Sequence, residues 1–281
     1  MSVVKSATGM PMAKLAALQH AMSPDIETNL ETARRMLGKA AEAGARLAVF
    51  PEVQLSPFFP VRRGNDASIY AMTADHPAMA ALGEMAKTNG IVTVANIYFE
   101  DVDGTRFDAS PVFDADGSLL GISKMVHIAQ FENFWEKDYY NSGSGFDVYD
   151  TAAGRLGIVI CYDRHFPESY RACALQGAEI IATPTCNLAG EPLDLFAGEM
   201  RALAFQNSVY SILANRCGKE GETAYGGHSV IAGPDGALLA EAGNSETVLT
   251  ANYDLAHRAE IAKAYGWLGE LKPWLMPGLN A

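Results

Sequence analysis

The feature that most constrains this chain is a repeated alternation of short apolar segments with helical segments. LAVFPE (47–52) and GIVIC (157–161) are nearly all apolar, which is typical of strands buried on both faces. In the segments between such strands, apolar residues recur three and four positions apart, the spacing of one helix face. This alternation predicts an α/β fold in which helices cover a sheet.

Turn and capping residues suggest where the elements begin and end. Ser23 is expected to cap a first helix with Pro24 at its first position, and Gly44 to end it. The apolar face of this helix is predicted to consist of Ile26, Leu30, Ala33, Leu37 and Ala41. Further helices are expected over 76–90, 166–177 and 196–207; strands over 13–18, 47–52, 91–100, 157–161, 178–185 and 208–216; a turn at 114–117; and a hairpin over 228–243.

Composition indicates a folded chain of one domain. Hydrophobic residues make up 49% of the 281 residues and charged residues 19%, so disorder over most of the length is excluded. No linker rich in Pro, Gly or Ser divides the sequence. We therefore expect a single domain over residues 1–281, with an irregular C-terminal tail from about residue 260 that packs on a partner.

Charge and cysteine pattern exclude several classes of function. The net charge of −12 argues against binding to nucleic acid, which needs a basic surface, and against binding to anionic lipid. The N-terminus does not resemble a secretory signal, and no apolar run reaches the roughly 18 residues of a membrane span. The cysteines form no CxxC and the histidines no HExxH, so these patterns predict neither a zinc ribbon, nor a thioredoxin-like motif, nor an HExxH metal site, and we expect a cytoplasmic protein with free thiols.

Four residues with reactive side chains follow or lie near predicted strands. Glu52 follows LAVFP, Lys124 follows GSLLGIS, Glu136 lies in FENFWEKDYY, and Cys161 ends GIVIC. Strand ends hold reactive groups rigidly in sheet enzymes. Each residue also has a plain structural interpretation: Glu52 as a helix cap, Lys124 as a solvated surface residue, and Cys161 as an inert buried thiol.

The residues after Cys161 favour a reactive thiol. YDRHFPE is polar, aromatic and charged directly after an apolar strand, unlike a plain packing turn. The backbone N–H of Tyr162 is expected beside the sulfur, where it would bind an oxyanion. Burial of Glu52 behind Phe50 and Pro51 would raise its pKa toward the range useful for a general base.

Seven segments in order resemble the nitrilase superfamily of carbon–nitrogen hydrolases. They are FPE (50–52), SKMVHI (123–128), WEKDYY (135–140), GIVICYDRHFPE (157–168), TPTCN (183–187), RALAFQNSVYSILANR (201–216) and GHSVIAGPDG (227–236). The resemblance implies a four-layer α-β-β-α sandwich, a homodimer or higher even homo-oligomer, and no metal. It further implies a Glu–Lys–Cys triad with Glu52 as base, Lys124 as oxyanion stabiliser, Cys161 as nucleophile and Glu136 as an additional site glutamate.

One segment departs from the family pattern. In most members an arginine precedes the lysine and a histidine follows two residues after it. Here Ser123 precedes Lys124, and His127 follows at three residues. The loop is one residue out of step, which leaves the role of His127 open.

The resemblance also limits the substrate. Arg164 stands where N-carbamoyl amino acid hydrolases carry an arginine, and a guanidinium there suits a substrate carboxylate, although structural pairing with Asp163 or Glu168 is the alternative. Asn187 matches a position lining the site of carbamoyl hydrolases, and Tyr162, His165 and His127 complete the predicted substrate-binding set.

Hydrolysis of an N-carbamoyl amino acid with release of ammonia is the favoured reaction at this stage. N-carbamoylputrescine amidase, ω-amidase and aliphatic amidase remain alternatives. A true nitrilase is disfavoured because Tyr162-Asp163 replaces the usual Trp-Glu. A catalytically silent scaffold, and the glutaminase module of a synthetase, are the alternatives from other classes; a scaffold would not need all four reactive residues.

Overall fold

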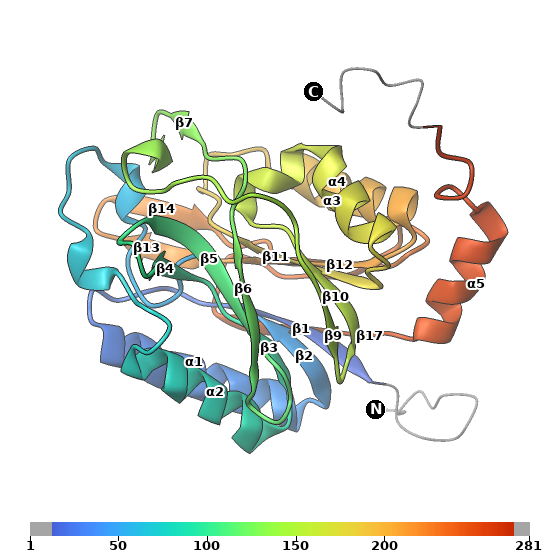
Figure 1. The fold of residues 1–281 in the computed structure, drawn as a ribbon, viewed down its shortest axis with the longest axis horizontal. Helices are drawn as coiled ribbons and strands as arrows, with labels where there is room; N and C mark the ends of the chain where they lie inside the picture. Colours follow the sequence, from blue (N-terminus) through green and yellow to red (C-terminus); the bar gives the residue numbers. More distant parts are fainter. Residues whose placement is uncertain (1–12, 273–281) are drawn as a thin grey trace.

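Two sheets packed face to face, each covered by a pair of helices on its outer side, form the body of the molecule (Figure 1). The computed structural model describes residues 13–272. The first sheet has the strand order β17-β1-β2-β3-β5-β4, with β6 also pairing β5. The bounds are β1 (Lys14–Gln19), β2 (Ala45–Val49), β3 (Val92–Val94), β4 (Ile97–Glu100), β5 (Arg106–Phe113), β6 (Leu119–Lys124), β17 (Thr247–Asn252), α1 (Ile26–Glu42) and α2 (Pro77–Asn89).

The second sheet has the order β16-β15-β12-β11-β10-β9. Its elements are β9 (Val148–Thr151), β10 (Gly154–Ile158), β11 (Ile180–Thr185), β12 (Tyr210–Asn215), β15 (Val230–Ala232), β16 (Leu238–Glu241), α3 (Pro167–Leu175) and α4 (Leu193–Asn207). Two small ribbons, short 3₁₀ turns and a last helix complete the described chain: β7 (Gln130–Phe131) with β8 (Phe134–Trp135), β13 (Cys217–Glu220) with β14 (Thr223–Gly226), η1 (Phe59–Val61), η2 (Ser68–Tyr70), η3 (Glu136–Asp138), η4 (Cys161–His165) and α5 (Leu255–Tyr265).

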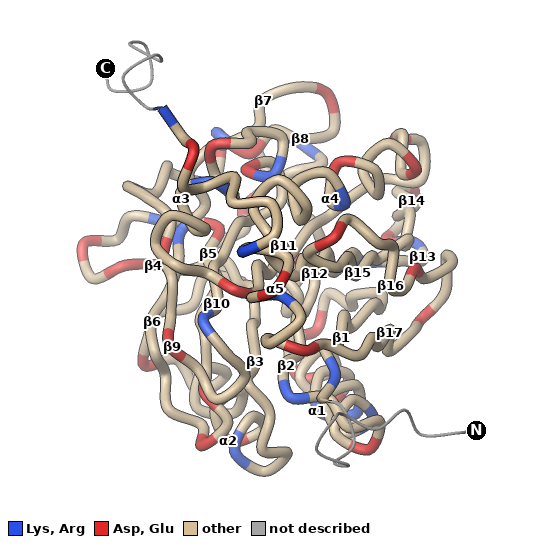
Figure 2. Tube along the Cα trace, turned by 90° about the vertical axis from the view of Figure 1, so that its right-hand side faces the viewer, with Lys and Arg blue, Asp and Glu red and all other residues tan. Residues whose placement is uncertain are grey.

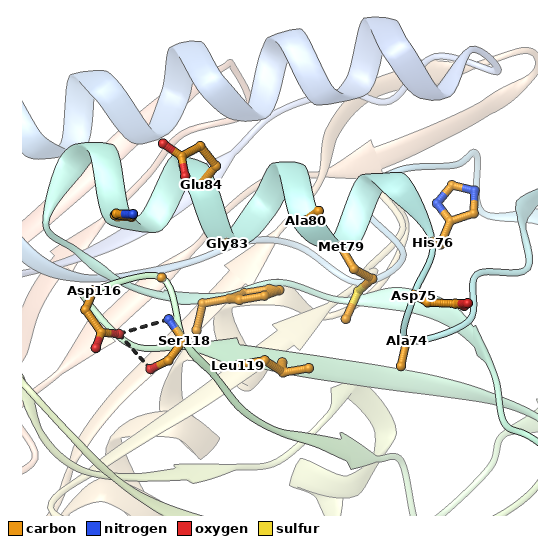
Figure 3. Close-up of a pocket in the computed structure, with 13 residues that line it drawn as sticks. Ala74, Asp75, His76, Met79, Ala80, Gly83, Glu84, Asp116, Ser118 and Leu119 are labelled. Carbon is orange, nitrogen blue, oxygen red and sulfur yellow. Dashed lines mark hydrogen bonds between the residues drawn. The ribbon is translucent and has the colours of Figure 1, made fainter.

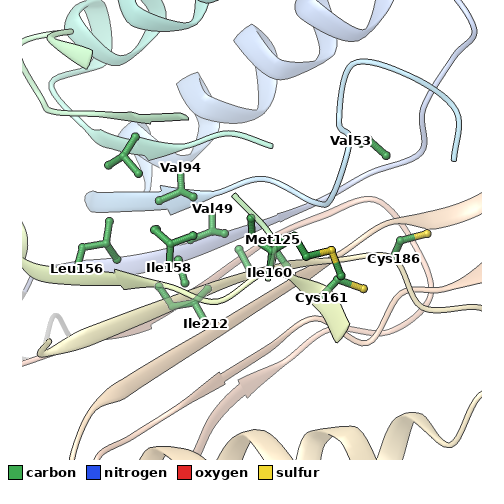
Figure 4. Packing of buried hydrophobic residues seen from close by; sticks show 14 of the residues in the cluster. Val49, Val53, Val94, Met125, Leu156, Ile158, Ile160, Cys161, Cys186 and Ile212 are labelled. Atoms are coloured by element: carbon green, nitrogen blue, oxygen red, sulfur yellow. The ribbon is translucent and has the colours of Figure 1, made fainter. Parts of the chain in front are cut away.

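The alternation of side chains along each strand builds the layers. In β1, Leu15 and Ala17 face the other sheet, whereas Ala16 and Leu18 pack toward α1 and α2. A central cluster joins the two sheets, and separate clusters join each sheet to its helices. Figure 4 shows side chains of the central cluster, including Val49, Val94, Ile158 and Ile212. The predicted four-layer α-β-β-α sandwich is confirmed.

Parallel strands at the centre of each sheet determine where the site lies. β1, β2 and β3 run parallel in the first sheet, as do β10, β11 and β12 in the second. The carboxyl ends of parallel strands meet at one edge, where ligands bind in open α/β sheets. The N–H of Glu52, after β2, donates to the carbonyl of Thr185 at the end of β11 (3.3 Å), so these ends of the two sheets are in contact.

Several predicted boundaries are wrong. Asp25, rather than Ser23, caps α1, because its carboxylate accepts from the N–H of Thr28. The strand predicted over 91–100 is two strands, interrupted where the side chain of Asn96 turns to Val53 and Asp108. β10 ends at Ile158, before Cys161.

The tail predicted to be irregular from about residue 260 contains part of α5, which ends at Tyr265 with Gly266 in the left-handed conformation. Trp267 stacks on Tyr265. Pro273, Trp274 and Pro277, also predicted to lie in that tail, are outside the described residues.

Charges of both signs are interspersed along the chain (Figure 2). Among the described residues, no helix is both long and apolar enough to cross a membrane.

Candidate active site

Cys161, Glu52 and Glu136 lie together where the two sheets meet. The Sγ of Cys161 and a carboxylate oxygen of each glutamate lie within 4.8 Å of one another, and all three side chains are buried. A small pocket reaches this group from outside; Cys161 and Glu136 line it, together with Ala129, Phe131, Phe134, Tyr162, Arg164, His165, Asn187 and Glu191. The structure therefore brings together three of the four residues predicted for catalysis.

Cys161 stands at a sharp turn between β10 and η4. Its φ of +42° lies in the left-handed region, which costs a non-glycine residue energy and is found at functional sites. The hydroxyl of Thr185 donates to its Sγ (3.3 Å). Tyr162 follows in the first turn of η4, where backbone N–H groups have no partner within the helix. This position agrees with the sequence-based expectation that the backbone N–H of Tyr162 can bind an oxyanion.

The Glu52 carboxyl is completely buried, and neither of its oxygens has a hydrogen-bond partner within the protein. Burial raises its pKa well above the usual range, and Cys161, Asp108 and Glu136 raise it further. Its backbone is fixed from both sides, because its carbonyl accepts from Nη2 of Arg216 (2.5 Å). A carboxyl with a raised pKa beside a thiol has the properties of a general base.

Asp108 is a further buried acid that the sequence interpretation missed. It lies in β5, and Asn96 Nδ2 donates to its Oδ1 (2.7 Å) while Oδ2 has no partner. Burial raises its pKa to about 6. The signal in the sequence was an acid in the middle of the otherwise largely apolar strand RFDASPVF.

Glu136 begins η3 and is held by the backbone. Its Oε2 accepts from the N–H of Ala129 (2.9 Å), whereas its Oε1 has no partner. Burial raises its pKa to about 8. Glu136, Glu52 and Asp108 are thus three buried carboxyls that influence one another, and each has at least one oxygen without a hydrogen-bond partner.

The structure does not bring Lys124 to the group formed by Cys161, Glu52 and Glu136. Its amino group pairs with Asp101 and lies over the ring of Phe107 (4.1 Å), and its side chain is 28% exposed. In the register of β5 and β6, Lys124 is opposite Ala109, which together with Phe107 packs on the helix-covered face of the first sheet. Lys124 therefore points away from the space between the sheets.

Met125 occupies the position that the family pattern assigns to the lysine. Counting back two residues from His127 leads to Met125 rather than Lys124. Met125 is fully buried in the central cluster that also contains Cys161, and Figure 4 shows the two side chains next to each other. Successive side chains along an extended chain point to opposite faces, so Lys124 and Met125 point in opposite directions. Because of the one-residue offset, the side chain next to Cys161 is a thioether and not an ammonium group.

Arg164 is buried beside the thiol. Its Nη1 donates to the carbonyl of Cys161 (2.8 Å) and to Oγ1 of Thr185 (3.0 Å), and lies 3.9 Å from Sγ. Its Nε is 3.6 Å from Glu199 and its guanidinium lies over the Phe196 ring (4.6 Å). It therefore pairs with neither Asp163 nor Glu168, the partners considered from the sequence.

The remaining predicted residues divide between the pocket and its support. Tyr162, His165 and Asn187 line the pocket, and His165 Nδ1 is 3.0 Å from Glu199. His127 instead stacks on Phe166 (3.8 Å between centroids) and bonds Asp163 (2.7 Å). It is not among the residues that line the pocket, and its contacts hold the loop after β6 against Asp163 and Phe166.

Two other features of the molecule, a possible metal-binding group and a second hollow, bear on where the active site lies. Among residues 13–272, the side chains that lie close enough to share a metal ion are those of Cys161, Glu52 and Glu136. The expectation that the site contains no metal stays a prediction. A larger hollow of about 520 Å³ lies between α2 and the β5–β6 turn. Figure 3 shows Met79 and Leu119 lining it, with Ser118 bonded to Asp116. It contains no cysteine and shares no residue with the pocket at Cys161.

Comparisons with known proteins agree with this geometry. Residues 14–263 match the carbon–nitrogen hydrolase family. The N-carbamoylputrescine amidase of Solanum tuberosum is 34% identical, over 90% of this chain and 89% of that protein. An omega-amidase of Xenopus laevis is 32% identical, over 88% and 91%. The crystal structure of a carbon–nitrogen hydrolase from Helicobacter pylori G27 superimposes with a TM-score of 0.89 at 25% identity, covering 96% of this chain and 98% of that one.

Proposed function

This chain belongs to the carbon–nitrogen hydrolase family and is a hydrolase of amide-type C–N bonds, and on that premise we propose that it removes ammonia from a small N-carbamoyl compound by way of a thioester on Cys161. The observation that carries this proposal is that the Cys161 thiol lies close to the buried carboxyls of Glu52 and Glu136, at a pocket that Cys161 and Glu136 line. The arrangement provides a nucleophile and a base within reach of one another.

Glu52 is the base in both halves of the reaction. Its carboxylate takes the proton of Cys161 as Sγ bonds to the carbamoyl carbon. The tetrahedral intermediate collapses, the C–N bond breaks, and Glu52 returns the proton to the departing ammonia. Glu52 then takes a proton from water as the water oxygen attacks the thioester carbon, and it passes this proton to the departing sulfur. The product is a carbamic acid, which loses CO₂ to leave the amine. The Tyr162 N–H, at the unpartnered start of η4, is the backbone donor for the oxyanion.

The surroundings of Arg164 favour a substrate without a carboxylate. A carboxylate clamp needs two parallel N–H groups, yet Nη1 of Arg164 is bonded to Cys161 and Thr185, and Nε faces Glu199. The pocket is lined by Glu191, whose charge suits an amine-bearing tail. An N-carbamoyl amine, the class named for the relative from Solanum tuberosum, therefore fits better than the N-carbamoyl amino acid favoured from the sequence.

The second candidate is an ω-amide, because the pocket also offers Asn187, whose amide pairs with either a ureido or an amide group. A cytoplasmic location and an even-numbered homo-oligomer remain predictions from the sequence.

Ammonia release from a panel tests the proposal: N-carbamoylputrescine, N-carbamoyl amino acids, α-keto ω-amides and short aliphatic amides, with Cys161→Ala as the blank and Cys173→Ala as the matched control. We expect turnover with the N-carbamoyl amine, none with Cys161→Ala, and full turnover with Cys173→Ala. Turnover that survives in Cys161→Ala would refute the nucleophile, and turnover limited to carboxylated ureido compounds would restore the carboxylate clamp.

A further inference from the structure

Among the described residues, no lysine lines the pocket at Cys161, where the family pattern leads us to expect one. A thiolate attacking an amide generates negative charge on sulfur and then on oxygen, and Glu52, Asp108 and Glu136 add acidic groups on one side. Lys124 is paired with Asp101 outside the space between the sheets, and Met125 carries no charge. Some other group must supply the positive charge.

Arg164 is the candidate with the required position. It is 1% exposed, and among the described residues that line the pocket it is the one permanent cation. Its Nη2 has no hydrogen-bond partner within the protein although it is buried, so a donor remains free. Arg164 also lowers the pKa of Cys161, opposing the larger effect of burial, which raises it.

The other cations near the site are already neutralised. Arg216 touches the backbone of Glu52, but its guanidinium pairs with Glu220. His165 pairs with Glu199, and neither Arg216 nor Lys124 lines the pocket. Glu199 also forms an ion pair with Nε of Arg164 (3.6 Å), but it makes no hydrogen bond there and leaves Nη2 without a partner.

Resting on the proposed function, we infer that Arg164 replaces the missing lysine: its Nη1 edge, with the Thr185 hydroxyl, stabilises the Cys161 thiolate, and its free Nη2 stabilises the oxyanion of the carbamoyl group. No proton leaves Arg164 during the cycle, because a guanidinium stays charged. The role differs from a carboxylate clamp, since it acts on the reacting carbon of every substrate, including those with no carboxylate.

A charge-relocation experiment tests this assignment. Arg164→Gln, Met125→Lys and the double variant are compared by kcat and KM on the best uncharged or amine-bearing substrate, and by the rate of iodoacetamide labelling of Cys161. We expect Arg164→Gln to lower kcat by about 10²–10³, the cost of removing one oxyanion donor, with KM little changed. Adding Met125→Lys to Arg164→Gln is expected to raise kcat at least tenfold above that of Arg164→Gln alone, because a lysine then stands next to the thiol.

A purely structural arginine would not be rescued by a lysine at another position, so a folded double variant without recovery overturns the inference. A change confined to KM for carboxylated substrates would overturn it in favour of a clamp. If Arg164→Gln does not fold, Arg164→Lys decides: it keeps the charge, and retention of a tenth or more of kcat supports the inference, whereas a hundredfold loss in a folded protein opposes it. Wild-type protein inactive on the whole panel, with Cys161 unlabelled, would instead refute the proposed function itself.

Discussion

The two sheets of the sandwich contribute different chemistry to the site. The first sheet and the segment that follows β6 supply acids and a thioether, in Glu52, Asp108, Glu136 and Met125. The second sheet supplies the thiol of Cys161, with Thr185 and Arg164 bonded around it. Proton acceptors and nucleophile thus come from separate layers, and they meet only when the central cluster between the sheets is packed.

This division also shows where charge has been placed. In the pattern that the sequence resembles, the first sheet carries both the base and the cation. Here Met125 removes the cation from that side, and the buried guanidinium lies on the side of the nucleophile. Burial is the main reason why the pKa of each carboxyl on this side is raised, and the charges of Arg216 near Asp108 and of Arg164 near Glu136 oppose it only in part.

The largest expected effect comes from removing the base on the acidic side. Glu52→Gln keeps the shape of the side chain but accepts no proton, so kcat should fall by about 10²–10⁴, the usual contribution of general base catalysis. Steady-state ammonia release measures it, with circular dichroism to establish that the variant is folded. A loss of less than tenfold would show that another group takes the proton of Cys161.

Restoring a cation to the acidic side should change the pH dependence. In Met125→Lys, an ammonium is placed next to Cys161, whose Sγ lies within 4.8 Å of the Glu52 carboxylate, so we expect it to lower the pKa of that carboxyl by about 1–3 units, the usual effect of a nearby opposite charge. Because Glu52 must be ionised to act as base, the acidic limb of kcat/KM against pH moves to lower pH. Met125→Leu is the volume-matched control and should leave the limb in place; an unmoved limb in Met125→Lys would contradict the position assigned to Met125.

Removing a negative neighbour should act in the same direction but less strongly. Asp108→Asn can still accept from Asn96, and it removes one of the charges that raise the pKa of Glu52. We expect the acidic limb of kcat/KM to move to lower pH by about one unit or less. Movement to higher pH would mean that Asp108 is neutral in the active enzyme and donates to Glu52.

Glu136 should affect stability through pH. Its pKa is raised from 4.5 to about 8 on folding, so the folded state binds this proton more tightly than the unfolded chain does. The resulting stabilisation is complete below pH 4.5 and is lost as pH rises through about 8. Urea unfolding at several pH values should show this decline in wild type and a flatter dependence in Glu136→Gln, with exposed Glu132→Gln as the control; equal slopes in all three would contradict it.

The smallest expected effect is that of Lys124→Met, for which the family motif and the structure predict different results. Lys124→Met removes the lysine that the sequence assigned to the oxyanion, but in the structure that lysine pairs with Asp101. We expect kcat/KM to stay within about twofold and stability to change by less than about 1 kcal/mol, as for exposed ion pairs. A loss of a hundredfold in a folded variant would return Lys124 to the site and remove the basis for the role of Arg164.

The sequence by itself predicted the alternation of strands and helices, because strand and helix periods are local properties, whereas the four-layer arrangement was implied by the resemblance to the family. The nearly all-apolar segment 47–52 and the helical spacing of Leu30, Ala33 and Leu37 were sufficient to predict a buried strand and a buried helix face. The segment around Cys161 was likewise recognisable, since a polar run after an apolar strand is visible without any partner. The acids of β5 and the loop after β6 were not recognisable in this way.

Only the tertiary structure decided which side of β6 faces the thiol. Lys124 and Met125 are neighbours in the chain, and one position along a strand reverses the direction of the side chain. The pairing of β6 with β5, which sets Lys124 opposite Ala109, directs the ammonium to the helix side and the thioether to Cys161. The same alternation turns Asp108 inward. The register of one strand against a distant strand is a non-local property. A short motif therefore predicts which residues lie near a site, but it does not predict which of two neighbouring side chains points into that site.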